Sequence, residues 1–546
     1  MFKQISLILR ENIVLVFIIA IYSLAISSII SWGIPNLAHP FTYNMDEWHQ
    51  LQAVRDLFRY GTPNIPGAAH GSIFQFLLSG IYLIPFIIFR VVNPFIIHSS
   101  IDNLEMQEKL FVVMRSNTLL FGILSMIVLI VIVKKYLKTD SILTTLLLVG
   151  TPIWLTLSSY FKYDVALIFW ISLSILFLLR YAKKPTLKNY LFSAIPCALA
   201  FATKVSAIPM LVIYVFSFFL FTQGWNKKYK QLMLGIAVFL SVFIILGIPD
   251  LIFRLSDYSE YLSSNLITSA QRDSNYLLGV SNKWIYILFV LFPITFGHLY
   301  YILFLIAFIY LFFKFARRGY LNINPENKND IFLLFSLVIF LLSLIPLGLG
   351  ASGNRLLVLL PFFVLITSRF IVEMMKKFGK YRIRMLILLS ILILLQLRES
   401  SVVIYQKYSK SVLQISSDWI VENIPKDTII GIENIPIYQT LPDVVLKEYY
   451  LNISDKYAKT NYKYEVVSAS TMNLPEVIVI TNRHVHEKYL IKSPKKNLLD
   501  RLRRDNYKVV GEFRPSSDLY HFFGNDRDYY LSGLNFVLPV TIYERG

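Results

Sequence analysis

Long apolar runs constrain this chain more than any other feature of its sequence. A helix needs roughly 20 apolar residues to cross a bilayer, and about eleven stretches approach that length. Because 55% of the 546 residues are hydrophobic and only 16% are charged, we expect a polytopic α-helical membrane protein. The candidate spans are residues 11–33, 112–133, 141–159, 164–180, 188–203, 205–222, 232–249, 295–313, 331–349, 355–374 and 383–398. The first run is too long for a signal peptide and no small-residue cleavage site follows it, so we expect it to be retained.

Basic residues fall in alternate connections between these runs, which is the positive-inside pattern of membrane proteins. With the N-terminus in the cytoplasm, the inner connections hold Lys134, Lys135 and Lys138; Arg180, Lys183, Lys184 and Lys188; Lys227, Lys228 and Lys230; Lys314, Arg317 and Arg318; and Lys376, Lys377, Lys380, Arg382 and Arg384. The pattern holds only if a further apolar stretch, 73–97, does not cross, so we expect it at the outer surface. The same residues explain much of the net charge of +19, which favours lipid headgroups over nucleic acid as partners.

The composition changes near residue 398, which predicts two domains. Residues 1–398 form the membrane domain, with a long outer loop at 34–111, and residues 399–546 are polar and rich in Lys, Asp and Tyr. In the second part, 428–432, 477–480 and 509–513 are typical of strands, and 415–424 and 498–504 are typical of helices. This alternation predicts a small extracytoplasmic α/β domain. The single cysteine, Cys197, excludes an intramolecular disulfide and a cysteine metal cluster. The usage of Lys and Ile suits a prokaryotic plasma membrane.

Two adjacent carboxylates, Asp46 and Glu47, stand shortly after the first apolar run. They begin an expected amphipathic helix over 46–60, whose apolar stripe is made by Trp48, Leu51, Val54 and Phe58. Ionisable groups beside lipid are costly and are therefore candidates for function. Asn44 followed three residues later by Glu47 also fits a helix capping box. From these residues alone, capping and catalysis are equal alternatives.

The predicted topology gathers further polar residues at the outer membrane face. Lys and Arg can hold a phosphate, and a carboxylate can take a proton from an attacking hydroxyl. Acids and bases at one lipid–water boundary suit a reaction on a lipid-linked phosphate. The collected residues are Asp46, Glu47, His70, Lys162, Asp164, Lys204, Arg272, His298 and Arg355.

Each of these residues also has a structural alternative that the sequence leaves open. Asp164 can cap the helix that follows it, Lys204 can extend to the membrane interface, and Arg355 can anchor a helix end. His70 and His298, each beside a glycine, can be polar loop or packing residues. What the functional hypothesis adds is that all of them share one side.

Four motifs in order carry a resemblance to a known family. They are Asp46-Glu47, Tyr160-Phe161-Lys162-Tyr163-Asp164, Ala202-Thr203-Lys204 and Asn354-Arg355-Leu356-Leu357-Val358-Leu359-Leu360-Pro361. Over residues 1 to about 375 the pattern resembles the GT-C glycosyltransferases. It is most similar to the protein O-mannosyltransferase-like branch, which includes the aminoarabinose transferases that modify lipid A. Asp418-Trp419-Ile420 and Asn423-Ile424-Pro425 resemble the extracytoplasmic domain of many bacterial members.

The resemblance implies an inverting transfer of a sugar from a polyprenyl-phosphate donor on the outer side of the membrane. It implies Asp46 as the general base or its organiser, Glu47 as its support or a metal ligand, and Asp164 as the acid of the second loop. Lys204 and Arg355 would hold the donor phosphate. The cofactor expectation is none apart from a candidate divalent metal.

Lys162 and His70 complete the set of substrate-binding candidates. One departure concerns His70, because Ala69-His70-Gly71 stands where the aminoarabinose transferases carry Glu-Lys-Pro. The acceptor of the aminoarabinose transferases is therefore not inferred for this chain. The acceptor, a glycolipid, polysaccharide or protein of the cell envelope, is left open.

The alternative from another functional class is a carrier or flippase for a lipid-linked glycan. Carriers show broken helices, buried charges near the middle of the membrane and inverted repeats. In this sequence the charges cluster at helix ends and no repeat is visible, which favours the enzyme. A third alternative is a non-catalytic scaffold, which would leave the outer acidic and basic residues scattered. Convergence of these residues in space separates the hypotheses.

Overall fold

The computed structural model of the chain describes most of the membrane part and the core of the C-terminal part. The described residues are 12–36, 42–61, 73–95, 104–224, 228–247, 263, 283–318, 325–344, 353–433, 442, 444, 462–481, 494–514 and 539–546. Two residues from the sequence analysis, His70 and Arg272, lie outside these ranges.

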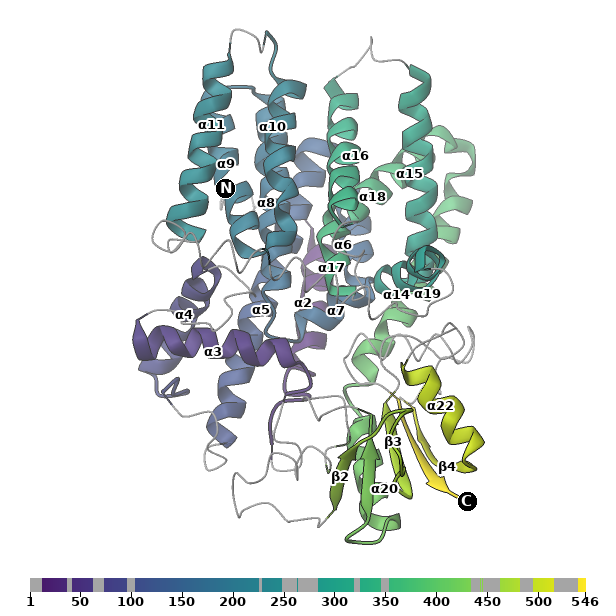
Figure 1. Ribbon diagram of the computed structural model, residues 1–546. Helices are drawn as coiled ribbons and strands as arrows, with labels where there is room; N and C mark the ends of the chain where they lie inside the picture. The colour runs from purple at the N-terminus through teal and green to yellow at the C-terminus, as the bar shows by residue number, and fades with distance from the viewer. Residues whose placement is uncertain are drawn as a thin grey trace.

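Apolar helices packed side by side make up the membrane part (Figure 1). Their bounds are α2 (Ile13–Ser27), α5 (Leu104–Ile132), α6 (Ser141–Val149), α7 (Pro152–Ser158), α8 (Tyr163–Lys183), α9 (Leu187–Thr203), α10 (Pro209–Phe221), α11 (Tyr229–Val242), α13 (Lys283–Tyr286), α14 (Phe292–Phe296), α15 (His298–Arg318), α16 (Pro325–Leu344), α17 (Gly353–Leu356), α18 (Leu360–Lys377) and α19 (Arg382–Tyr405). Short 3-10 and π-helical turns adjoin them: η2 (Val133–Leu137), η3 (Val205–Ala207), η5 (Phe243–Gly247), η7 (Ile287–Leu291), η8 (Leu357–Leu359) and η9 (Gly379–Tyr381).

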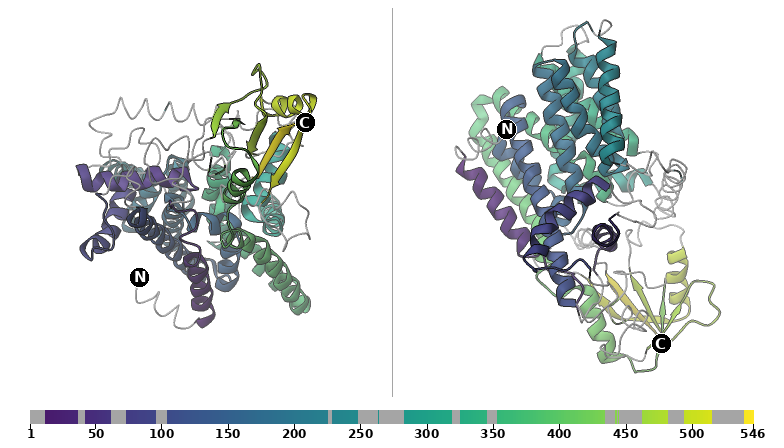
Figure 2. Two further views of the ribbon diagram at one scale, coloured as in Figure 1. Left: turned by 90° about the horizontal axis from the view of Figure 1, so that it is seen from below. Right: turned by 90° about the vertical axis from the view of Figure 1, so that its left-hand side faces the viewer.

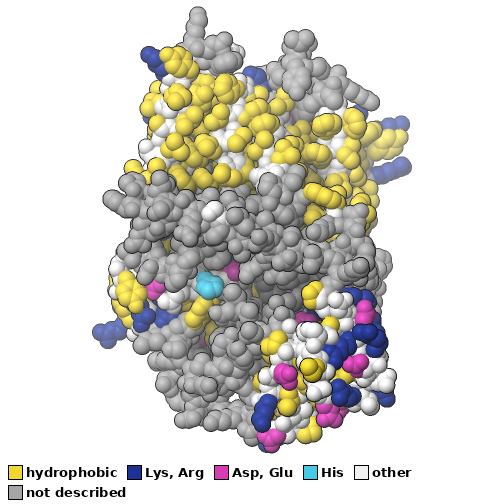
Figure 3. All heavy atoms as spheres, viewed as in Figure 1, with side chains coloured by type: hydrophobic (Ala, Val, Ile, Leu, Met, Phe, Trp, Pro, Cys, Tyr) yellow, Lys and Arg dark blue, Asp and Glu magenta, His cyan; other side chains and the backbone are white. Residues whose placement is uncertain are grey.

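The surface of the helical part is apolar, as a lipid-facing surface must be. Large hydrophobic side chains such as Ile13 on α2, Met233 on α11 and Ile383 on α19 are exposed. Figure 3 shows apolar side chains as a band over the helical part, with Lys and Arg at its upper and right-hand edges and mixed charges on the C-terminal part below. Because this much exposed apolar surface is not stable in water, the chain is a multi-pass membrane protein, as predicted.

Within the described residues, five helices are long and apolar enough to span a membrane, or up to seven if each of two bent pairs counts as one span. Every predicted apolar segment coincides at least in part with a helix. The predicted number of about eleven spans stays a prediction, because several of these helices are short. The last helix, α19, continues to Tyr405, beyond the predicted end of the membrane domain at residue 398.

Two apolar segments are sharply bent, and one helix stabilises both bends. The axes of α6 and α7 differ by 71°, and those of Trp284–Phe296 and His298–Lys314 by 113°. On α19, Gln396 Nε2 and Ser400 Oγ donate to the carbonyl oxygen of Gly150 at 3.1 and 2.5 Å, between α6 and α7. Glu399 accepts the backbone N–H of His298 at 3.3 Å, at the start of α15. Backbone groups that lose their helical hydrogen bonds inside a membrane need such partners. The side chains of α19 supply them and so stabilise both bends.

Two helices lie across the ends of the membrane helices, on the side that also carries the C-terminal sheet (Figures 1 and 2). We call this end of the membrane part the sheet side. The first, α3 (Met45–Tyr60), confirms the predicted amphipathic helix: Leu51 and Val54 are buried in a cluster against which Trp48 and Phe58 pack. The second, α4 (Ile73–Ile88), has 16 residues. It is shorter than the roughly 20 residues that a span needs.

The described residues of the C-terminal part form a five-stranded sheet with two helices, which confirms the predicted α/β class. The strands are β1 (Ile429–Ile432), β2 (Lys463–Val466), β3 (Val477–Thr481), β4 (Tyr507–Phe513) and β5 (Val540–Arg545), in the order β2-β1-β3-β5-β4. β1 pairs in parallel with β2 and β3, whereas β5 lies antiparallel between β3 and β4. The helices are α20 (Val412–Asn423) and α22 (Pro494–Arg504). Tyr43, just before α3, is buried in the same hydrophobic cluster as α20, β1, β3 and β5.

Candidate active site

Asp46 lies in the first turn of α3, where its helix cap holds it in place. Asn44 is the N-cap, and its side-chain oxygen accepts the N–H of Asp46 at 3.2 Å. The N–H of Asn44 itself donates to Thr42 Oγ1 at 3.3 Å. The Asn44 half of the predicted capping box is therefore confirmed, whereas Thr42 takes the place expected for Glu47. Capping by Asn44 thus orients Asp46 and does not compete with a chemical role for it.

Four predicted residues form one chain of alternating charges on the sheet side. Lys162 Nζ forms an ion pair with Asp46 Oδ2 and lies 3.7 Å from Asp164 Oδ2. Lys204 Nζ, at the end of α9, lies 2.6 Å from Asp164 Oδ1. The two inner side chains, Lys162 and Asp164, are 2% and 1% exposed, whereas Asp46 and Lys204 are 43% and 24% exposed. The chain therefore presents a carboxylate at one end and an ammonium at the other.

Lys162 stays charged in spite of its burial. Burial alone lowers the pKa of an ammonium, but the Asp46 and Asp164 carboxylates outweigh burial, and the pKa of Lys162 is raised above its ordinary value. A positive charge between two carboxylates favours their ionised forms. Lys162 therefore joins the two acidic residues electrostatically as well as geometrically.

Glu47 points away from Asp46 into the protein. It is 0% exposed, and Arg115 on α5 binds it through two N–H groups, Nε to Oε1 at 2.6 Å and Nη2 to Oε2 at 2.8 Å. The backbone N–H of Phe161 donates to Oε1 at 2.8 Å, and Thr42 Oγ1 donates to Oε2 at 2.6 Å. Through this bidentate, fully buried arrangement, Glu47 fastens three segments together: the first loop, α5, and the turn between α7 and α8.

The same geometry does not fit Glu47 as a metal ligand. A carboxylate offers about four acceptor sites, and the four hydrogen bonds to Glu47 occupy them. Among the described residues, no group of three or more His, Cys, Asp or Glu side chains is placed to hold a metal ion. We therefore assign no chemical step to a metal at Glu47.

The turn that carries Lys162 and Asp164 is held through its backbone at consecutive residues. The N–H of Phe161 is bound by Glu47, that of Lys162 by Thr118 Oγ1 at 3.3 Å, and that of Tyr163 by Gln50 Oε1 at 2.9 Å. These partners come from α3 and α5. The backbone is thereby fixed, and the side chains of Lys162 and Asp164 are left to form the charge chain.

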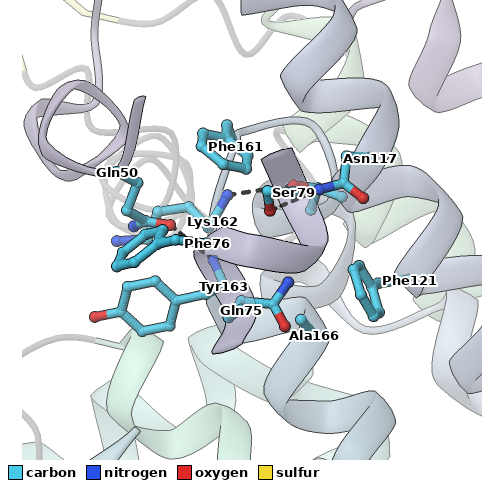
Figure 4. Close-up of a pocket in the computed structure, with 11 residues that line it drawn as sticks. Gln50, Gln75, Phe76, Ser79, Asn117, Phe121, Phe161, Lys162, Tyr163 and Ala166 are labelled. Atoms are coloured by element: carbon cyan, nitrogen blue, oxygen red, sulfur yellow. Dashed lines mark hydrogen bonds between the residues drawn. The ribbon is translucent and has the colours of Figure 1, made fainter. Parts of the chain in front are cut away.

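A small polar cavity lies behind Lys162, between α3, α4, α5 and α8 (Figure 4). It is lined by amide and hydroxyl groups of Gln50, Gln75, Ser79 and Asn117 together with aromatic rings. Gln50 Nε2 is buried and has no hydrogen-bond partner within the described part of the chain. The cavity therefore places polar groups next to the charge chain.

The other predicted residues are placed less directly. Arg355 is partly exposed on α17, which is followed by η8, a turn that contacts α8. His298, at the bend before α15, pairs through Nδ1 with Glu399 Oε1 at 2.6 Å and does not contact the four-residue charge chain. His70 and Arg272 fall outside the described residues, so their predicted roles stay predictions.

Two residues at this site were missed in the sequence. Arg115 had a signal, because it is a charge within the long apolar helix α5, and such charges mark functional or structural centres. Lys407 follows α19, and no sequence signal marked it as a functional residue. It is 5% exposed, and its Nζ lies 4.1 Å from the centroid of the Tyr160 ring. Both residues lie beside the turn that carries Lys162 and Asp164.

Several solved structures are similar to the chain, at low sequence identity. A crystal structure of ArnT from Cupriavidus metallidurans bound to undecaprenyl phosphate has 12% sequence identity and a TM-score of 0.46, with 97% of this chain and 98% of that chain covered. The apo form of the same protein has 11% identity and a TM-score of 0.45, with 98% of each chain covered. The Saccharomyces cerevisiae protein O-mannosyltransferase Pmt1-Pmt2 complex bound to the sugar donor has 13% identity and a TM-score of 0.29, with 42% and 33% covered. Likeness at this level does not define a function.

A family match covers the central helices. Residues 103–248 match the family model described as dolichyl-phosphate-mannose-protein mannosyltransferase, whereas no curated protein matches the chain in sequence. The matched segment contains Lys162, Asp164 and Lys204, and Asp46 precedes it. For this segment, the match confirms the predicted resemblance to a family of membrane glycosyltransferases.

Proposed function

We propose that the chain is an integral-membrane glycosyltransferase. It would move a sugar from a polyprenyl-phosphate donor to an acceptor at the sheet side of the membrane. The observation that carries the proposal is the convergence of Asp46, Lys162, Asp164 and Lys204 into one charge chain at that end. The family match over residues 103–248 supports the same reaction class.

In the proposed reaction, Asp46 is the general base. Of the two carboxylates in the charge chain, Asp46 is the more exposed, so an acceptor hydroxyl can reach it. As that proton passes to Asp46, the acceptor oxygen bonds to the anomeric carbon of the sugar. The bond from that carbon to the phosphate oxygen breaks, and polyprenyl phosphate leaves. Attack opposite the leaving group inverts the configuration at the anomeric carbon.

Lys204 and Arg355 are the residues that we propose bind the donor phosphate. Lys204 is partly exposed at the far end of the chain from Asp46, and an ammonium stabilises the charge that develops on a leaving phosphate. Asp164 and Lys162 position the two ends, and Glu47 supports Asp46 from within the protein. His70 stays a candidate substrate-binding residue of the first loop.

The proposed orientation follows from the distribution of charge along single helices. In α8, Asp164 is in the first turn, whereas Arg180 and Lys183 are in the last turn. Basic ends face the cytoplasm, so we propose a cytoplasmic N-terminus and an extracytoplasmic sheet side, in a plasma membrane. On this basis residues 1–398 and 399–546 are the membrane and extracytoplasmic domains. The acceptor is then a glycolipid, polysaccharide or protein of the envelope.

A carrier for a lipid-linked glycan is the second candidate, because the two bent segments are a feature of carriers. Against it, side chains of α19 satisfy both bends, and the acidic residues converge at one end. A single experiment separates the two. Purified protein is reconstituted into liposomes that contain a panel of polyprenyl-phosphate sugars, and an envelope extract is added. Formation of a glycosylated product supports the transferase, whereas lipid movement across liposomes without product supports the carrier.

A further inference from the structure

Lys407 is a buried lysine at the junction between α19 and the C-terminal sheet. Its Nζ donates to Ser159 Oγ at 2.5 Å and lies over two aromatic rings, 4.1 Å from the centroid of Tyr160 and 5.2 Å from that of Trp32. Within the described residues, no carboxylate forms an ion pair with it. The carboxylate of Glu47, whose charge acts on Lys407, is already paired with Arg115.

This placement is unfavourable for the stability of the fold. Burial, reinforced by the nearby positive charge of Arg115, lowers the pKa of Lys407 well below its ordinary value. A cation whose charged form is disfavoured by burial destabilises the folded state. An apolar side chain of similar length would avoid that cost. Lys407 must therefore contribute something other than stability.

Lys407 contacts the beginning of the turn that ends in the charge chain. Ser159 and Tyr160, its two partners there, directly precede Phe161, whose N–H is held by Glu47. The backbone N–H groups of the next two residues are held by α5 and α3. Lys407 adds side-chain contacts to the two residues before them, from the segment that links α19 to the C-terminal part.

A second contact ties the same junction to the loop before α3. Ser411, the N-cap of α20, has its Oγ 2.5 Å from the hydroxyl oxygen of Tyr43. Tyr43 is buried with α20 and the sheet in one hydrophobic cluster, and Asp46 follows it by three residues. The junction therefore contacts both segments that build the charge chain.

We propose that Lys407 is a positioning residue, which fixes Ser159 and Tyr160 and so holds Lys162 and Asp164 in register with Asp46. The C-terminal part is then an integral component of the candidate active site and not an appended module. The positional part of this inference is independent of the reaction. Only its effect on turnover rests on the proposed glycosyltransferase function.

The test replaces Lys407 with Met in the full-length protein, which keeps the length of the side chain and removes its donor. The matched control is Lys410→Met, the same change three residues away at an exposed ion pair with Asp418. Three quantities are compared with the wild type: the midpoint of thermal unfolding, hydrogen exchange of a peptide that covers 155–165, and kcat and KM for transfer from the polyprenyl-phosphate sugar panel.

For Lys407→Met, we expect an unchanged or higher unfolding midpoint and about tenfold faster exchange within 159–163. We also expect kcat to fall about 10- to 100-fold with little change in KM, because a small misplacement of reacting groups is costly. Lys410→Met should match the wild type throughout. Unchanged exchange, or faster exchange over the whole protein with a lower midpoint, would overturn the positioning role. If the wild type transfers no sugar, the proposed function fails, and the exchange comparison still decides the inference.

Discussion

Lys162 and Asp46, which are 116 positions apart in sequence, form an ion pair. This pair joins the turn between α7 and α8 to the start of α3. Lys162 is buried and Asp46 is partly exposed. The carboxylate is thus held from one side and open on the other. This is the arrangement that a base needs to receive a proton from an incoming hydroxyl, and the predictions below test its parts.

Glu47→Gln is expected to destabilise the protein strongly. The change leaves the buried guanidinium of Arg115 without its countercharge, which costs about 3–5 kcal/mol. The loss of stability is measured as a lower midpoint of thermal unfolding in detergent. The matched control is Glu105→Gln, which breaks an exposed pair with Lys109 and should leave the unfolding midpoint almost unchanged. A stable Glu47→Gln variant with no activity would instead identify Glu47 as a chemical participant.

Lys204→Gln is expected to weaken binding of polyprenyl phosphate. A charge-assisted hydrogen bond to phosphate contributes about 1.5–3 kcal/mol, so Kd should rise about 10- to 100-fold. The effect should shrink at high salt, because Lys204 is partly exposed and salt screens such charges. Equilibrium binding of the bare lipid phosphate checks it, with Lys410→Gln as control. Equal Kd values for Lys204→Gln and the wild type would remove Lys204 from the phosphate site.

The stability gained by Lys407→Met should depend on pH. Because the pKa of Lys407 is lowered on folding, the unfolded chain binds this proton more tightly than the folded one. Wild-type stability therefore falls as pH drops below the ordinary lysine pKa of about 10.4. The difference in unfolding midpoint between Lys407→Met and wild type should grow from pH 10 to pH 7. A constant difference would show that Lys407 keeps its ordinary pKa in the folded protein.

Gly297→Ala is expected to disrupt the bend before α15. Gly297 has a φ of +91°, and an added Cβ would lie 1.8 Å from Gln396 Nε2. The steric conflict adds about 1–3 kcal/mol to the cost of a non-glycine residue at this positive φ, which is also about 1–3 kcal/mol. Gly224→Ala, at φ +62° in open space, measures the conformational part alone. Equal losses in the unfolding midpoint for the two variants would contradict the contact between Gly297 and Gln396.

Much of the fold could be predicted because apolar segments in a membrane must be helical. Hydropathy placed α5, α8 and α18, and the spacing of apolar residues placed the amphipathic α3. The bends at Gly150 and Gly297 could not be predicted, because the groups that stabilise them lie on α19, far away in sequence. Strands β2 and β5 were also missed, since their stability comes from pairing with β1, β3 and β4 and not from a strong local pattern.

The site was predictable only as a set of residues on one side. The charge pattern of the loops placed Asp46, Lys162, Asp164 and Lys204 at the same end, and the structure joins them. Glu47 points away from Asp46 because it pairs with Arg115. No local sequence pattern could identify that pairing. Lys407 depends on the packing of the C-terminal part against the turn at 159–164, which sequence periodicity does not encode.

The most direct test of the account is sugar transfer by the purified Asp46→Asn protein. The change keeps the shape of the side chain and its N-cap contact through the backbone, but removes the proton acceptor. We predict that this variant reaches wild-type levels in membranes, binds polyprenyl phosphate with an unchanged Kd, and loses transfer by at least about 100-fold, the usual contribution of a general base. Transfer at the wild-type rate would contradict the assignment of Asp46 as the base and with it the proposed mechanism.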